Sequence, residues 1–211
     1  MQLPFTREAF LDQLATYNTA LWPVVLVIWG VSLAAALWLL SPSRVRGRWI
    51  GGLLAFHWAW SAIAYLAIYF TRINPAAWLF AAMFLFQASL LIWVAVFRNR
   101  LRFEATPGFW TTAGRALIAY ALLYPAINVM QHADVLRIPT FGLPCPTTLL
   151  TAGVLLVAAS PPRILFVVPI IWSAIGGSAA WLMDVHADYA LPVAGAMLAA
   201  SALSSNAPPN N

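Results

Sequence analysis

The stretch ALWPVVLVIWGVSLAAALWLL, residues 20–40, is apolar throughout and carries no charged side chain. A transmembrane helix needs about 20 consecutive apolar residues to cross roughly 30 Å of hydrocarbon. The composition of the whole chain agrees, since 63% of its 211 residues are hydrophobic and 8% are charged, against about 25% charged residues in soluble domains. The sequence therefore predicts an all-α, polytopic transmembrane helical bundle.

Further apolar segments follow residues 20–40, and we expect about seven spans within residues 19–204. These segments lie at 49–70, 76–97, 110–130, 146–160, 164–183 and 189–204. The segment 146–160 covers only about 22 Å at a rise of 1.5 Å per residue. The last segment is marginal in length, so six crossings plus a re-entrant piece stay open as an alternative. We expect the polar tail, residues 205–211, to be disordered.

Residues 1–18 read as a separate amphipathic helix at the membrane interface. Thr6 suits the cap position, and Phe5 can pack on Phe10 as a hydrophobic staple. Phe10, Leu14 and Tyr17 then fall on one face of the helix. A helix with one apolar and one polar face lies in the plane of the interface.

The eleven basic residues are all arginine, and seven of them lie in alternate loops, at 41–48, 98–109 and 161–163, whereas Arg7, Arg72 and Arg137 fall on the other face. The positive-inside rule places these loops in the cytoplasm, so we expect the N-terminus outside and the C-terminus inside. The net charge of +5 thus points to the lipid bilayer and not to nucleic acid. No phosphate-binding glycine loop occurs, so we expect no nucleotide. Whether the protein forms a homo-oligomer or belongs to a larger membrane complex stays open.

The single cysteine, Cys145, lies between two prolines and is followed by Thr147 and Thr148. Pro146 suits a first helical turn, where its missing N–H costs nothing, and threonine hydroxyls there lie near free amides. We expect this Pro-Cys-Pro-Thr-Thr segment on the outer face, where the fifth span begins. Two interpretations stay open: a rigid helix start with a packed thiol, or a ligand-binding segment that uses Cys145, Thr147 and Thr148.

The tripeptide His-Ala-Asp occurs twice in the expected outer loops, at residues 132–134 and 186–188. With Cys145, these loops supply the imidazole, carboxylate and thiol groups that zinc or copper binds, although no tight ligand spacing is present. The candidate metal ligands are His132, Asp134, Cys145, His186 and Asp188. The alternative is that they are solvated loop residues and helix caps.

The polar side chains within the spans include His57, Gln87 at a similar depth, and Asn128 toward the outer side. An imidazole in hydrocarbon needs a hydrogen-bond partner, which Gln87 or a hydroxyl group would supply. We treat the three as candidate ligand-binding residues, with a helix-to-helix hydrogen bond as the alternative for His57. The span interiors carry no Asp, Glu or Lys, which disfavours proton-coupled transport.

Three segments carry a resemblance to a known family: residues 3–8 with Tyr17-Asn18 and Trp22-Pro23, residues 139–148, and residues 172–180. Together they resemble a family of small bacterial inner-membrane proteins classed as a domain of unknown function. The resemblance covers nearly the whole chain and implies a multi-pass protein of the bacterial inner (plasma) membrane. It implies no activity, substrate or catalytic residue.

The first functional hypothesis is a permease-like or ligand-binding membrane protein whose site opens outward near the Pro-Cys-Pro-Thr-Thr segment. A membrane-embedded enzyme, or a redox or metal accessory that uses Cys145, is the alternative. A subunit of a larger membrane complex is the third hypothesis. The catalytic residues stay unknown, and so does any cofactor, with zinc, copper or a quinone as the possibilities for the Cys145 hypothesis.

Overall fold

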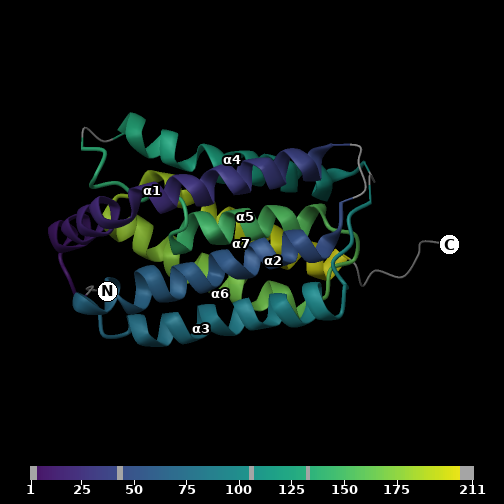
Figure 1. Cartoon of the computed structure of the whole chain (residues 1–211), viewed down its shortest axis with the longest axis horizontal. Coiled ribbons are helices and arrows are strands. Elements are labelled where there is room, and N and C mark those ends of the chain that lie inside the picture. Colours follow the sequence, from purple (N-terminus) through teal and green to yellow (C-terminus); the bar gives the residue numbers. More distant parts are fainter. Residues whose placement is uncertain (1–3, 42–44, 105–106, 132–133, 205–211) are drawn as a thin grey trace.

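A computed structural model describes residues 4–41, 45–104, 107–131 and 134–204. The tail 205–211, predicted to be disordered, and His132 lie outside these residues. The described chain is all α, as predicted, and its seven α-helices run lengthwise along the molecule (Figure 1). They are α1 (Arg7–Leu40), α2 (Gly47–Trp60), α3 (Ala77–Leu91), α4 (Phe109–Gln131), α5 (Pro144–Val157), α6 (Ile164–Met183) and α7 (Ala190–Ser204).

Shorter helical pieces extend three of these helices. Two are π-helical: η1 (Ser61–Ala67) continues α2, and η3 (Ile92–Phe97) continues α3. Two are 3-10 turns: η2 (Phe70–Arg72) follows η1, and η4 (His186–Tyr189) leads into α7. With these extensions, six helices of the described chain are long and apolar enough to cross a membrane. Their outward side chains include large exposed apolar residues, such as Leu79 at 71% exposure, which suits a lipid environment.

The helix predicted at residues 1–18 is not separate from the first span. Thr6 caps α1 by accepting the Ala9 N–H at 3.2 Å, and the rings of Phe5 and Phe10 lie 6.3 Å apart, as expected. The helix then continues for 34 residues to Leu40. The length of α1, about 51 Å, exceeds the thickness of the hydrocarbon layer. The amphipathic turns and the first span are therefore parts of one continuous helix. Their position at the interface stays a prediction.

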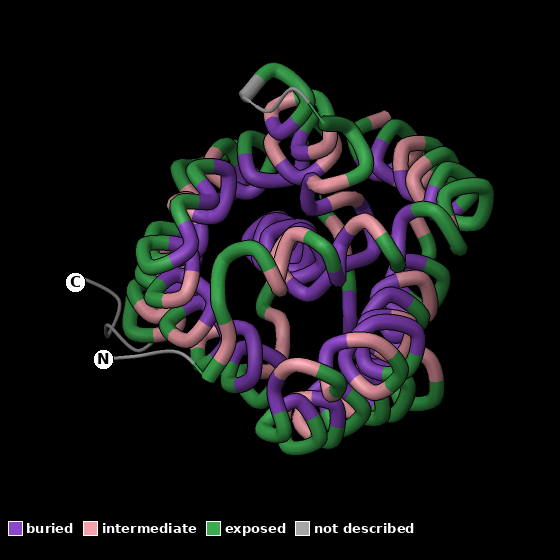
Figure 2. Tube along the Cα trace, turned by 90° about the vertical axis from the view of Figure 1, so that its left-hand side faces the viewer, coloured by how far each residue is buried: buried purple, intermediate pink, exposed green. Residues whose placement is uncertain are grey.

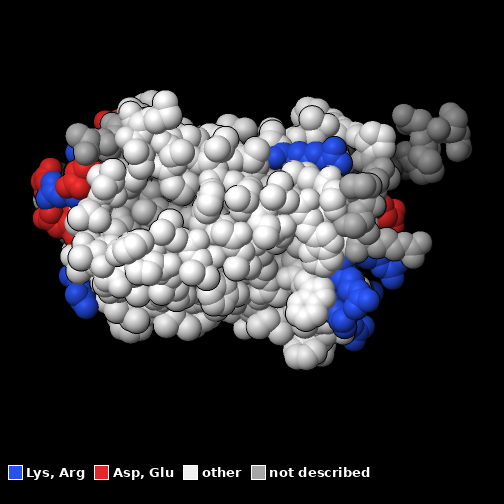
Figure 3. All heavy atoms as spheres, turned by 45° about the horizontal axis from the view of Figure 1, so that its top comes forward, with Lys and Arg blue, Asp and Glu red and all other residues white. Residues whose placement is uncertain are grey.

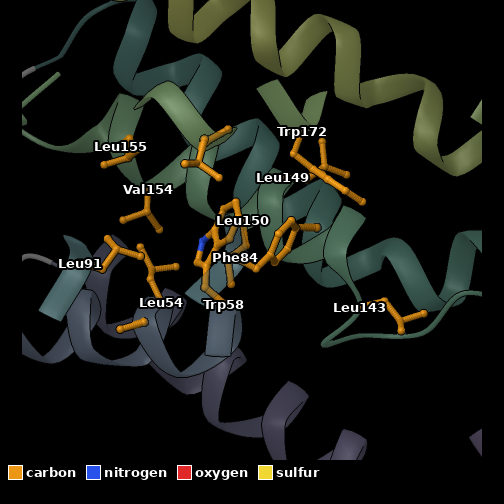
Figure 4. Close-up of a cluster of buried hydrophobic side chains, with 14 of the residues drawn as sticks. Leu54, Trp58, Phe84, Leu91, Leu143, Leu149, Leu150, Val154, Leu155 and Trp172 are labelled. Atoms are coloured by element: carbon orange, nitrogen blue, oxygen red, sulfur yellow. The ribbon is translucent and has the colours of Figure 1, made fainter. Parts of the chain in front are cut away.

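The short fifth helix, α5, forms the centre of the bundle. Viewed along the bundle, a helix that is buried throughout lies inside a ring of the others (Figure 2), and 13 of the 14 residues of α5 are buried. Its leucines face Trp58 of α2 and Phe84 of α3 (Figure 4), whose rings lie 4.3 Å apart. Glycines allow α4 to approach closely, because a Cβ at Gly153 would lie 2.7 Å from the carbonyl oxygen of Gly114.

The Pro-Cys-Pro-Thr-Thr segment lies deep in the bundle, not on the outer face as predicted. A non-helical segment, residues 138–143, which includes a turn with Gly142 at φ 86°, carries the chain inward. The Ser61 hydroxyl, midway along the second span, donates to the Gly142 carbonyl at 2.7 Å. Asn18 holds this segment, because its amide donates to the carbonyls of Leu136 at 2.7 Å and Ile138 at 2.9 Å. The short helix α5 therefore covers only about 21 Å, and the non-helical segment before it covers part of the remaining length of the bundle.

Charged side chains gather at the two ends of the molecule, and few lie between them (Figure 3). The end that holds the start of α1 carries acids and arginines together, including Arg137, which contacts Asp12 and lies 3.3 Å from Glu8. The hydrogen bond with Asp12 raises the pKa of the Arg137 guanidinium. At the opposite end, Ala159 N–H donates to the Arg102 carbonyl at 2.8 Å, which joins two of the arginine-bearing loops.

Candidate functional site

A cavity of about 320 Å³ lies toward the end of the bundle that holds the start of α1, and Phe5 and Phe10 line it. Its walls come from the start of α1, from η1, η2 and α3, and from α6, while its floor is the start of α5. The wall is almost entirely apolar and rich in rings. The aromatic residues that line it are Phe5, Phe10, Tyr65, Phe70, Phe80, Tyr124 and Trp172.

The rings at the cavity mouth pack on one another. Phe5 and Phe70 meet edge to face at 5.3 Å, and Phe70 stacks on Tyr65 at 5.6 Å. On the α6 side, Phe80 meets Trp172 edge to face at 5.4 Å. The start of α1 is tied to this rim, because Arg7 Nε donates to the Met183 carbonyl at 3.1 Å. The first turn of α1 therefore covers part of the cavity.

The floor carries three polar side chains that come from three different helices. Asp188 is only 6% exposed, and the Tyr124 hydroxyl donates to its Oδ1 at 2.5 Å. Cys145, the one residue of α5 that is not fully buried, places its thiol beside the same carboxylate. Tyr124, Cys145 and Asp188 form what we call the polar floor.

Two further polar groups of the cavity wall have no oxygen or nitrogen partner in the described part of the chain. They are the Tyr65 hydroxyl and the Trp172 indole N–H, and both residues are buried. Tyr65 lies near Cys145 and Asp188, and the Trp172 indole lies beside the Cys145 thiol, a weak acceptor. Buried polar groups in proteins are nearly always satisfied, so these two groups indicate a place for a polar atom of a ligand.

Local backbone features position these two side chains. Tyr65 lies on the π-helical turn η1, and such turns shift every following side chain around the helix axis. Trp172 lies one turn before Gly176, where an added Cβ would lie 3.1 Å from the indole nitrogen. The indole thus occupies space that only glycine leaves open at that position.

Comparison with known protein families finds a match over nearly the whole chain. A family model described as "Family of unknown function (DUF6064)" matches residues 7–208. The chain belongs to the DUF6064 family. No curated protein and no solved structure matches it. The predicted resemblance to a family of unknown function is thus confirmed, and the DUF6064 match brings no activity with it.

The predicted ligand-binding residues of this DUF6064 chain fall into two groups. Cys145 lines the cavity, whereas Thr147 and Thr148 lie behind it in the core. Thr147 Oγ1 pairs with Ser61 Oγ at 3.1 Å, and Thr148 Oγ1 donates to the Pro144 carbonyl at 2.8 Å. The two threonine side chains therefore satisfy polar groups of the fold.

His57, Gln87 and Asn128 are buried and do not line the cavity. Of the partners considered for His57, a hydroxyl group is the one observed, since Ser32 Oγ lies 2.7 Å from Nε2. Gln87 is not that partner, because its amide donates to the Leu165 carbonyl at 3.0 Å. Asn128 donates to the Tyr124 carbonyl at 3.0 Å, one turn earlier on α4.

The candidate metal ligands are dispersed where the structure describes them. Asp134 is exposed and accepts the Leu136 N–H at 2.9 Å. His186 pairs with Asp184 at 2.9 Å on the surface, whereas Asp188 lies in the polar floor with Cys145. Among the described residues, no group of three or more His, Cys, Asp or Glu could hold a metal ion. A zinc or copper site that includes His132 stays a prediction.

The sequence places Asp188 in an outer loop before the span at residues 189–204. The last of the helices long and apolar enough to cross a membrane begins at His186, so Asp188 lies in the first turn of that helix and is buried. Tyr65, Tyr124 and Trp172 lie outside the predicted set of site residues. The spacing of apolar residues holds no signal for them, because they meet only when α2, α4 and α6 pack together.

Proposed function

We propose that this membrane protein binds a small apolar molecule with one polar group in the cavity, as a permease-like or ligand-binding protein. One observation supports the proposal above all. An apolar, aromatic wall ends on a polar floor beside two buried groups without an oxygen or nitrogen partner in the described chain, the Tyr65 hydroxyl and the Trp172 indole N–H. Ligand sites are typically apolar with a few polar groups that fix the orientation of the ligand.

The orientation of the protein belongs to the same proposal. With the arginine-bearing loops at 98–109 and 161–163 in the cytoplasm, the cavity opens outward, toward the side where α1 begins. A ligand would then enter from the outer side of the membrane. The single cysteine at the floor, Cys145, reports occupancy, because a bound molecule shields its thiol from small alkylating reagents.

The test uses purified protein in phosphatidylcholine nanodiscs and 4-tert-butylbenzyl alcohol as a neutral probe with one hydroxyl. We expect the probe to slow alkylation of Cys145 by N-methylmaleimide in a saturable manner and to raise the Tm. Ala179→Trp fills the cavity, because Ala179 lines it, and should abolish the rise in Tm. Ala174→Trp is the matched control, since Ala174 lies on the exposed face of the same helix. Equal binding by both variants, or no binding by the native protein, overturns the proposal.

A further inference from the structure

We propose that the ligand is a lipophilic organic cation, a hydrophobic amine or quaternary ammonium, and that Asp188 is its counter-ion. This inference rests on the proposed function and specifies the class of ligand. It draws on three features of the cavity: the unpaired charge on its floor, the rings of its wall, and the scarcity of groups that would bind an anion.

The charge of Asp188 lacks a counter-ion. The carboxylate is 6% exposed, and its neighbours are the Tyr124 hydroxyl and the Cys145 thiol. No ion pair to a basic residue forms at Asp188 in the described part of the chain. Buried charges in proteins are normally paired, so an incoming cation would satisfy this carboxylate.

The position of Asp188 in its helix favours the negative charge. Asp188 lies in the turn η4, directly before α7 begins at Ala190. The amides at a helix start carry a partial positive charge that stabilises an acidic side chain. The start of α7 therefore helps to keep the carboxylate ionised, and thus able to attract a cation.

The aromatic wall supplies the second feature. Ring faces carry a negative potential that attracts cations within about 6 Å, and proteins use such rings to bind quaternary ammonium groups. Tyr65 and Trp172 line the cavity close to the polar floor, with Phe70 and Phe80 packed against them. If the cation carries N–H groups, the free Tyr65 hydroxyl accepts one hydrogen bond and Asp188 accepts another.

The third feature is a shortage of groups for an anion. No basic residue lines the cavity within the described chain; Arg7 lies at the rim, where it binds the Met183 carbonyl. The start of α5 also offers little, because two of its first three residues, Pro144 and Pro146, have no N–H. Cys145 carries the one remaining amide, far from the several that an anion site at a helix start uses.

The experiment compares two probes of the same shape and different charge. Benzyltrimethylammonium is a cation, and neopentylbenzene is its neutral isostere, with carbon in place of nitrogen. Protection of Cys145 from N-methylmaleimide and the rise in Tm are measured in zwitterionic phosphatidylcholine nanodiscs, with phenylacetate as the anionic probe. We expect the cation to bind at least about tenfold more tightly than the isostere, and phenylacetate not to bind.

Asp188→Asn removes the charge and keeps the acceptor for the Tyr124 hydroxyl, so this variant should abolish the preference for the cation. The outcomes separate the two proposals. Binding of the neutral isostere as tight as that of the cation overturns this inference and leaves the proposed function standing. If benzyltrimethylammonium, neopentylbenzene and 4-tert-butylbenzyl alcohol all fail to bind, both proposals are overturned. Should Asp188→Asn not fold, the comparison of the three probes on the native protein still decides.

Discussion

The Nε2 atom of His57 lies 2.7 Å from the hydroxyl oxygen of Ser32, and both residues are buried in the bundle. The Ser32 hydroxyl donates to the Ile28 carbonyl at 2.8 Å, so its oxygen accepts from the imidazole. In this arrangement the imidazole of His57 carries a proton on Nε2. This hydrogen bond joins α1 to α2 within the apolar interior.

Ser32→Ala should destabilise the protein by about 1–3 kcal/mol, because it leaves the imidazole N–H without an acceptor. A double-mutant cycle that combines His57→Leu with Ser32→Ala should show coupling between the two sites. The matched cycle of His57→Leu with Gln87→Leu should be additive, since Gln87 binds the Leu165 carbonyl. The measurement is the free energy of unfolding in detergent. Additivity in the first cycle would contradict the pairing.

Gly153→Ala should cost about 1–3 kcal/mol of stability, the range for overpacking in a close contact. The added Cβ would lie 2.7 Å from the Gly114 carbonyl oxygen and 2.8 Å from Ile118 Cγ1. Gly30→Ala is the control on a helix, because nothing lies within 4 Å of a Cβ there, and it should be neutral or stabilising. Thermal unfolding of both variants is the readout, and equal shifts would argue against a tight α4–α5 contact.

Asn18→Leu should loosen the non-helical segment at residues 138–143, because both of the carbonyls that Asn18 binds would lose their donor. We expect faster alkylation of Cys145 by N-methylmaleimide and a lower Tm. Thr16→Ala is the control, since Thr16 is exposed on the same helix and binds only within it. An unchanged alkylation rate in Asn18→Leu would show that the segment is held by other contacts.

The orientation predicts which introduced cysteines react in intact cells. In a Cys145→Ser background, Val135→Cys should react with an impermeant maleimide added outside, because Val135 is exposed at the end of the bundle where α1 begins. Arg46→Cys, at the opposite end, should react only after the cells are opened. Labelling of residue 46 from outside would reverse the orientation.

The sequence predicts the spans well, since a run such as residues 20–40 needs only length and hydropathy to be recognised. It does not predict that α5 avoids lipid, because lipid-facing and protein-facing residues are equally apolar. The π-helical turn at Ser61–Ala67 changes the direction of Tyr65, and a period of 3.6 residues does not anticipate this. Asp188 looks like a loop residue until α4 and α5 cover it.

The enclosed position of α5 sets an order for assembly of the protein. The chain is synthesised from its N-terminus, and nearly all of α5 contacts protein, including α4, α6 and α7. Its neighbours α6 and α7 are synthesised after it, so α5 reaches its final surroundings only when the last helix has been made. A chain shortened before Ala190 would leave the centre of the bundle open and should be recognised and degraded by membrane proteases.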